Sequence, residues 1–416
     1  MSKSPASTRS LAALVVGNVL GGIGVASGIA VGALLVASMG GVELAGFGQA
    51  LSVLGAALLA VPLANLAARR GRRRSLATGY AVAALGALIV LVGAWLGWFW
   101  LLLLGLLAFG SAQATNLQTR YAASELATPE RRATIMSIVI WATTIGSVLG
   151  PNLSSVGAAV GRRIALPDLA GPYLFSLTGF VLAGLVIVLL FAARRAPLTG
   201  PEPGPAPAKP AKTVGALAAL RWASHHPVAR FAVLLIVVGH AVMVGIMSMT
   251  PVQLGHHGHG LQAVGLVISL HILGMYALSP LVGWLADRFG AMRTSLVGLI
   301  LLGLSAVVIL AAPSAFVSVT IALVLLGVGW SFTTISGSAL LARVDAGEVR
   351  VPLQGATDAL MNYGAATAAL LGGPLLAWIG FGGLAIAAGA LILPAAAVGW
   401  YARRHRDAAF AGSDQR

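Results

Sequence analysis

The sequence predicts an all-α membrane protein of twelve transmembrane helices, arranged as two six-helix halves. Of its 416 residues, 58% are hydrophobic and only 9% are charged, which lies outside the range of soluble globular domains. Runs of about twenty apolar residues, each long enough to cross a bilayer, recur twelve times. Sequence elements of the first half also return in the second, as expected of two related halves.

The twelve predicted spans are 11–38, 44–68, 75–96, 98–119, 133–156, 172–192, 228–252, 262–285, 293–312, 315–340, 353–378 and 381–401. The first span is too long for the core of a signal peptide, so we expect a retained helix. A stretch rich in Pro, Ala and Gly at 196–212 predicts a flexible linker between spans six and seven. The expected domains are the first half at 1–193, a cytoplasmic linker at 194–227, and the second half with its tail at 228–416.

The basic residues predict the orientation. If the N-terminus is cytoplasmic, 24 of the 26 Lys and Arg residues lie on the cytoplasmic side, and only Arg162 and Arg163 lie outside. This distribution follows the positive-inside rule and places both termini in the cytoplasm. Since the basic residues sit in short loops between hydrophobic spans, the net charge of +15 does not indicate nucleic acid binding.

Two sequence elements recur at nearly constant offsets. Gly-Trp-Leu-Ala-Asp-Arg-Phe-Gly at 283–290, after span eight, echoes Leu-Ala-Ala-Arg-Arg-Gly-Arg-Arg at 66–73, after span two, with matching positions 219 residues apart. Gly150-Pro151 returns 223 residues later as Gly373-Pro374. Parallel repeats of this kind occur in secondary transporters, which bind substrate near the midplane between the halves. The 283–290 element resembles the loop motif of the major facilitator superfamily. That resemblance implies the superfamily's fold and a gating role for Asp287, Arg288 and Gly290.

The first-half copy of this motif departs from the pattern. Ala68 stands where the aspartate belongs and Ala64 where the first glycine belongs, so we expect a different contact at this gate. Asp358, inside span eleven, is expected to pair with the basic cluster at 69–74 or to couple protons. Arg120, at the inner end of span four, is expected to extend to the interface or to pair with Glu125.

Histidine and methionine are concentrated between His240 and Met275, a 36-residue stretch that holds five of the eight histidines and four of the nine methionines. At about 100° per residue, His240, Met243 and Met247 share a helical face, and His271 and Met275 share another. Thioether and imidazole ligands favour a soft cation such as Cu(I), and the chain has no cysteine.

The spacings Met243-x-x-x-Met247 and His271-x-x-x-Met275 resemble the paired motifs of the CcoA-like copper importers of bacteria. The resemblance implies that these four residues are copper ligands and that the protein lies in a bacterial cytoplasmic membrane. His240 is an additional ligand, a proton carrier or a packing residue. The outer loop contains three histidines, His256, His257 and His259. These either capture metal or are simply polar residues of a turn.

The predicted function is therefore copper uptake by alternating access, without an enzymatic activity or a resident cofactor. The expected partners are the lipid bilayer, the transported copper ion or organic solute, and a cytoplasmic copper acceptor. Proton-coupled export or import of an organic molecule is the alternative, and Gly146-x-x-x-Gly150-Pro151 resembles the span-five motif of drug/proton antiporters. A metal-binding receptor or assembly factor that does not transport is a third hypothesis.

Overall fold

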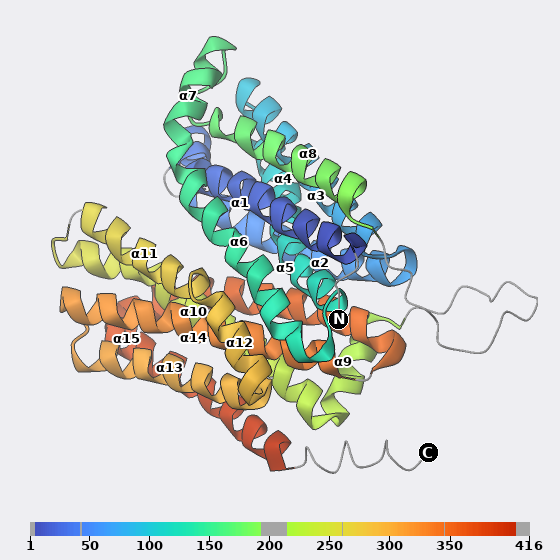
Figure 1. Cartoon of the computed structure of the whole chain (residues 1–416). Helices are drawn as coiled ribbons and strands as arrows, with labels where there is room; N and C mark the ends of the chain where they lie inside the picture. Colours follow the sequence, from blue (N-terminus) through green and yellow to red (C-terminus); the bar gives the residue numbers. More distant parts are fainter. Residues whose placement is uncertain (1–4, 42–43, 193–213, 260, 345, 405–416) are drawn as a thin grey trace, which may run out of the picture.

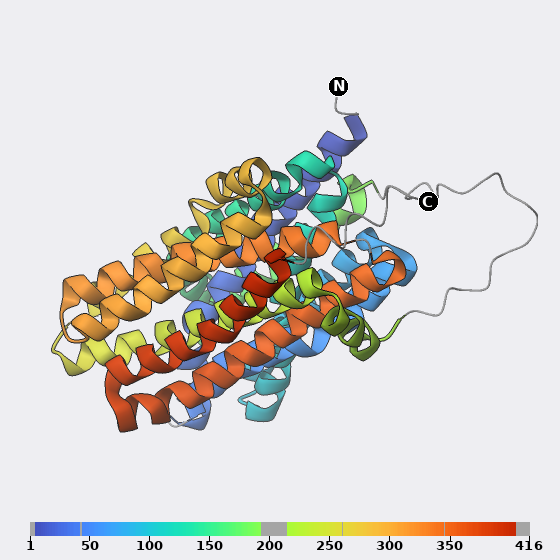
Figure 2. The ribbon, with the colours of Figure 1, turned by 90° about the horizontal axis from the view of Figure 1, so that it is seen from below.

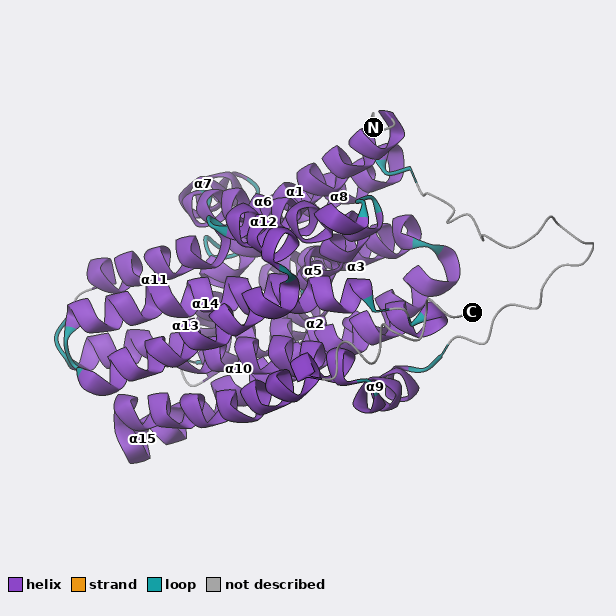
Figure 3. Ribbon diagram, turned by 60° about the horizontal axis from the view of Figure 1, so that its bottom comes forward, coloured by secondary structure: helices purple, strands orange, loops and turns teal. Residues whose placement is uncertain are grey.

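The computed structural model describes residues 5–41, 44–192, 214–259, 261–344 and 346–404. Among these residues every regular element is a helix (Figure 3). The first half contains α1 (Pro5–Gly40), α2 (Ala45–Arg70), α3 (Arg72–Trp95), α4 (Phe99–Phe109), α5 (Ser111–Glu125), the short η2 (Pro129–Arg131), α6 (Arg132–Asn152), α7 (Ser154–Arg163) and α8 (Pro172–Leu190). The second half contains α9 (Ala216–His225), α10 (Pro227–His256), α11 (Leu261–Tyr276), α12 (Ser279–Phe289), α13 (Ala291–Ala311), α14 (Phe316–Arg343), the short η3 (Gly347–Val349) and α15 (Arg350–Arg404).

The twelve predicted spans coincide with these helices. Ten helical stretches of the described residues are long and apolar enough to cross a membrane, and three of them combine consecutive helices: Phe99–Glu125, Leu266–Phe289 and Gly347–Arg404. The fifth predicted span corresponds to α6, which is not among the ten. The last two spans form α15, whose two legs meet at Gly380 and lie side by side (Figure 2). Gly380 has φ 67° and ψ −178°, a conformation that is open essentially only to glycine.

The first half has its own apolar core, and the core of the second half also includes Ala133 and Ile140 of α6. Small residues let the helices approach closely. A Cβ at Gly105 of α4 would lie 2.6 Å from the backbone nitrogen of Val90 on α3. Glycine at such positions brings membrane helices into backbone contact, and van der Waals packing then holds them. The predicted linker at 196–212 lies outside the described residues. After it, α9 packs against α10 and α15.

The two halves meet at one end of the molecule and diverge towards the other (Figure 1). At the end where they meet, α2 packs along α15 and α6 along α12. This joined end carries the start of α1, α9 and the turns that were predicted to be cytoplasmic. At the opposite, splayed end, α7 and the turn between α10 and α11 lie far apart (Figure 1).

Candidate functional site

Asp287, at the end of α12, binds the first half across the joined end. Its carboxylate accepts hydrogen bonds from the backbone nitrogens of Ala133 (3.1 Å) and Thr134 (2.8 Å) and from the Thr134 hydroxyl (2.8 Å). These two residues form the first turn of α6, where free N–H groups and the helix dipole favour a negative charge. Asp287 also forms an ion pair of 2.9 Å with Arg343 of α14. One carboxylate therefore joins two elements of its own half to the start of a helix in the other.

The other two predicted gating residues flank Asp287 in different ways. Gly290 has φ 91°, so the turn that follows α12 requires glycine. Arg288 is exposed beside the contact. The motif is therefore placed where the halves touch, and Asp287 makes the contact.

The first half makes a matching contact with reversed charges. Arg72, which begins α3, donates to Oε1 of Glu125 at the end of α5 (3.1 and 2.9 Å) and to Oε1 of Gln354 on α15 (2.6 Å). In the second half an acidic residue near the end of α12 pairs with an arginine of α14. In the first half the basic first residue of α3 pairs with a glutamate of α5. The gate without the motif's aspartate, at Ala68, is therefore held by a different set of side chains.

A buried ion pair joins the halves between these two contacts. Arg120 of α5 donates from Nη2 to Oδ1 of Asp358 on α15 and to the Tyr121 hydroxyl (3.2 Å). Both charged side chains are 1% exposed. The predicted partners were therefore wrong: Arg120 neither extends to the interface nor pairs with Glu125, and Asp358 does not pair with the 69–74 cluster. The reason is that Glu125 is held by Arg72, whereas Arg120 faces α15.

Small residues define how closely the helices approach at the joined end. On the second-half motif helix, a Cβ at Gly283 would overlap Ser137 and Ala133 of α6. At the equivalent first-half position Ala64 has a Cβ, and the glycine stands opposite it on α15, as Gly355. The departure from the motif at Ala64 is thus compensated by a glycine on the facing helix.

His271 of α11 points at α14. Its Nδ1 lies 2.7 Å from the carbonyl oxygen of Leu323, the residue is 0% exposed, and Nε2 is buried without a hydrogen-bond partner among protein groups. Since a carbonyl only accepts, Nδ1 carries the proton and Nε2 has the free lone pair. This is the tautomer that metal-binding histidines adopt when a carbonyl orients them.

The predicted methionine ligands lie in the core of the second half. Met243 is 2% exposed and Met275 is 6% exposed, while Met247 is partly buried against the same core. Helix α10 packs mainly on α15 and α14, and α11 packs mainly on α14, so the two helices have little contact with each other. Among the described residues, no three His, Cys, Asp or Glu side chains lie close enough to hold a metal ion. A metal site here would therefore depend on thioether ligands.

His240 has a different partner from His271. Its Nδ1 accepts a hydrogen bond of 2.7 Å from Nε1 of Trp330 on α14, so Nδ1 carries no proton, and in the neutral ring Nε2 carries it. Tyr276 of α11 packs edge-on against Trp330, with ring centroids 5.5 Å apart. In this arrangement His240 offers an N–H donor and no free lone pair. It therefore fits hydrogen bonding to a solute better than binding a metal.

The three outer histidines face different neighbours. His257 contacts the Gln253 carbonyl oxygen (2.9 Å), and His259 lies against the ring of Phe316. His256 lines a pocket of about 580 Å³ between the splayed ends of α10 and α15, together with Met249. The three imidazoles therefore do not converge on one point.

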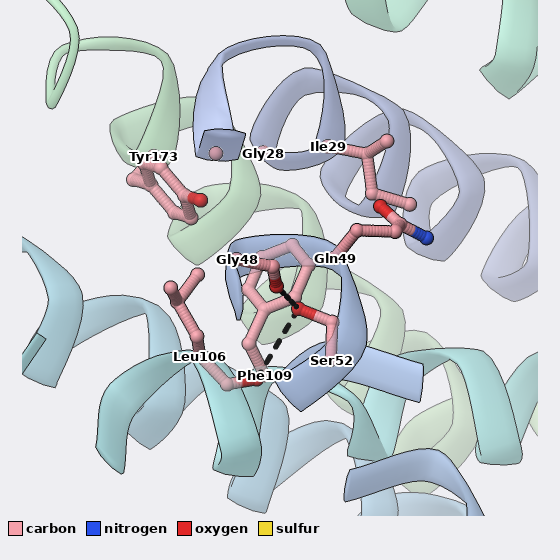
Figure 4. Close-up of a pocket in the computed structure, with 9 residues that line it drawn as sticks. Gly28, Ile29, Gly48, Gln49, Ser52, Leu106, Phe109 and Tyr173 are labelled. Carbon is pink, nitrogen blue, oxygen red and sulfur yellow. Dashed lines mark hydrogen bonds between the residues drawn. The ribbon is translucent and has the colours of Figure 1, made fainter. Parts of the chain in front are cut away.

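The first half contains a polar network that the sequence did not predict in detail. Asn18 donates to Val139 O (2.7 Å) and Thr143 Oγ1 (2.8 Å), and the Tyr80 hydroxyl donates to Asn116 Oδ1 (2.8 Å). These bonds tie neighbouring helices together. A nearby pocket has room for about one water, and Ser52 in it bonds backbone carbonyls (Figure 4). It is too small for a solute.

The comparisons with known proteins agree with this architecture. The family model of the Major Facilitator Superfamily matches residues 13–266 and 254–415. The uncharacterized MFS-type transporter YddS of Bacillus subtilis is 37% identical over an alignment of 420 residues that covers 96% of this chain and 92% of that protein. The riboflavin transporter RfnT of Brucella anthropi is 30% identical over 327 residues, covering 78% and 77%.

Solved structures share the fold. The human organic anion transporter MFSD10 superimposes with a TM-score of 0.76 at 17% identity, covering 95% of this chain and 100% of that one. A bacterial homologue of the iron transporter ferroportin, in an outward-facing state, gives 0.71 at 19% identity, covering 95% and 99%. The protein is a multi-pass membrane transporter. It belongs to the major facilitator superfamily. Neither YddS nor RfnT is named as a copper importer.

Proposed function

We propose that this protein moves a small solute across a bacterial cytoplasmic membrane by alternating access, with both termini in the cytoplasm. The observation that carries this proposal is the joined end. Every hydrogen bond between the described halves belongs to the Asp287, Arg72 and Arg120 contacts or lies beside them. Since this end carries the basic turns, the cytoplasmic side is closed and the halves diverge towards the outside.

An organic solute is the cargo that this geometry supports best. His240, Trp330 and Tyr276 combine an imidazole N–H with two aromatic rings at the depth where α10, α11 and α14 come together. Organic ligands are commonly held by aromatic walls with a few placed polar groups. The relative RfnT, named as a riboflavin transporter, suggests a planar, polar heterocycle as the first compound to test.

Copper is the second cargo hypothesis, and His271 supports it. Its free Nε2 lone pair is buried, its tautomer suits a metal, and Met275 follows one turn later on the same helix. Against it, His271 is fully buried inside one half, whereas transporters of this architecture bind cargo between the halves. Copper transport would require α11 to move away from α14, and would pass the ion to a cytoplasmic acceptor.

Parallel uptake assays separate these hypotheses. Cells that lack their own importers receive radiolabelled riboflavin or radiolabelled copper, and the parent is compared with His240→Ala and with the double variant Met247→Ala, His271→Ala, all confirmed in the membrane. An organic cargo predicts riboflavin uptake that falls at least about tenfold in His240→Ala, which loses a buried hydrogen-bond donor, and changes little in the double variant.

Copper as cargo predicts the opposite result. Copper uptake by the parent should then vanish in the double variant and persist in His240→Ala. If a well-expressed parent accumulates neither compound, both cargos are rejected. Efflux from preloaded vesicles would then test transport in the other direction.

A further inference from the structure

A pocket of about 580 Å³ separates the outer ends of α10 and α15. That volume lies within the range of binding sites for small organic molecules. Among the described residues, its walls come from these two helices alone. Both helices belong to the second half. The pocket therefore lies within one half, whereas the cargo of such a transporter binds between the halves.

The internal repeat shows that this pocket is particular to the second half. Gly373 lines the pocket and corresponds to Gly150 of α6, at the offset of 223 residues. In the first half, a Cβ at Gly150 would lie 2.4 Å from the Cβ of Ala26 on α1, so the two helices touch. In the second half, a Cβ at Gly373 would meet no atom within 4 Å. The same pair of repeated helices is therefore closed in one half and open in the other.

A larger side chain on α10 accounts for the opening. At the same offset, Met249 stands where the first half has Ala26. The Met249 side chain lies against α15, since a Cβ at Gly372 would be 3.1 Å from Met249 Cγ. A long, flexible thioether side chain thus stands between two helices that alanine allows to touch.

A hydrogen bond between the helices is also lost in the second half. The Ser27 hydroxyl of α1 donates to the carbonyl oxygen of Gly150 on α6 (3.2 Å). Its counterpart at the same offset, Thr250, donates to the carbonyl oxygen of Ile246 on its own helix (2.9 Å). The hydroxyl that ties the repeated helices together in the first half therefore leaves them free to separate in the second.

The lining of the pocket defines the chemistry of its occupant. Its apolar side chains are aliphatic, and they are Met249, Val252, Leu376 and Ala377. No aromatic ring lines the part of the wall that the structure describes. A planar aromatic ring would therefore find nothing to stack on, whereas an aliphatic chain finds side chains of its own kind.

The polar side chains of the pocket lie towards its outer end. Gln253 and His256 follow Met249 by four and seven residues on one face of α10, which places His256 about 10 Å further out along the helix. The Gln253 Nε2 donates to the carbonyl oxygen of Pro313 (2.9 Å), so the amide is fixed and its Oε1 is left to accept. The exposed imidazole of His256 can donate or accept.

We propose that this pocket binds an aliphatic amphiphile with a hydroxyl-bearing head. The chain lies along Met249, whose flexible side chain adapts to its shape. A hydroxyl of the head donates to Oε1 of Gln253 and bonds to His256. The occupant is the chain of a membrane phospholipid or a free single-chain molecule, which share this chemistry. The site is additional to that of the transported cargo and does not depend on which cargo is moved.

Photolabelling of the full-length protein in lipid vesicles tests the site. Two probes carry a diazirine on the aliphatic chain: a monoacylglycerol added from outside, and a phosphatidylglycerol built into the vesicles. Mass spectrometry of the digested protein should place adducts at 249–256 and 373–380. Adducts from either probe support the site and identify the source of the occupant, and adducts from neither overturn the proposal.

Variants that fill the pocket separate binding there from general labelling by lipid. Gly373→Leu and Ala377→Leu each place a larger side chain in the pocket and should lower the adducts at 249–256 roughly tenfold, since even one methylene in an apolar pocket changes affinity about that much. Two variants cover the case in which one of them fails to fold. The control is Gly303→Leu, because a Cβ at Gly303 also meets no atom within 4 Å but lies on α13, outside the pocket.

Equal labelling of the filling variants and the control overturns the proposal. Excess riboflavin or copper should leave the adducts unchanged, because the pocket lies apart from the cargo route. Displacement of the probe by either compound would overturn that separation. Failed uptake of both compounds with intact labelling rejects the proposed cargos, and not this site.

Discussion

Asp287 holds the two halves of this transporter together with one carboxylate. It accepts two backbone N–H groups of α6 and pairs with Arg343. The sequence motif predicted that this aspartate matters but not its partners, because Arg343 lies 56 positions away along the chain and Thr134 lies 153. For the same reason the Arg120–Asp358 pair, separated by 238 positions, was missed. Only the fold brings such residues together.

Two substitutions at Asp287 separate its two roles. Asparagine still caps a helix about as well as aspartate but loses the charge that binds Arg343. Alanine loses both interactions, and we expect about 1–3 kcal/mol less stabilisation of the closed joined end. Opening of the joined end should therefore increase in the order parent, Asp287→Asn, Asp287→Ala, measured as the reactivity of a cysteine placed at Ala133. Equal reactivity in the two variants would show that the ion pair contributes nothing.

At the scale of helices, each gate interface has one small residue where two helices touch. Gly283 lies on the motif helix α12, whereas Gly355 lies on α15, opposite Ala64 of the motif helix α2. The sequence showed that the motif glycine is missing at Ala64. It did not show that Gly355 replaces it, because the sequence does not reveal which helix a glycine in an apolar span faces. The predicted spans were confirmed, because the apolar length that identifies a span can be read from the sequence without knowing which helices it packs against.

Exchanging the two residues tests this complementarity. Gly355→Ala should force α2 and α15 apart at a cost of about 1–3 kcal/mol for overpacking, and Ala64→Gly in the same chain should restore the closed state. The cycle of single and double variants, followed by energy transfer between fluorescent labels on the two halves of the joined end, isolates the pairwise contribution. Gly303→Ala serves as the control, because a Cβ there meets no atom within 4 Å. A double variant as open as Gly355→Ala would contradict the proposed contact.

At the scale of the molecule, the hydrogen bonds that join the two halves within the described residues lie at one end, and the halves diverge from there (Figure 1). If each half moves as a rigid body, closing one end separates the other. The positive-inside count predicted which end faces the cytoplasm, since charge distribution is a property of loops that sequence displays directly. It could not predict which end is closed, because that depends on the balance of two sets of contacts within one fold. Alternating access requires the two ends to respond in opposite directions.

Hydrogen exchange in vesicles tests this reciprocity. In the parent, backbone amides at the starts of α6 and α15 should exchange slowly, and those of α7 and the α10–α11 turn faster, because local opening follows exposure and contact density. Gly355→Ala weakens the joined end alone, yet two rigid halves can part there only by closing at the splayed end. Exchange should therefore rise at the starts of α6 and α15 and fall at α7. If it rises at both ends, the substitution loosens the fold rather than shifting it between two states, and the alternating-access proposal loses its structural basis.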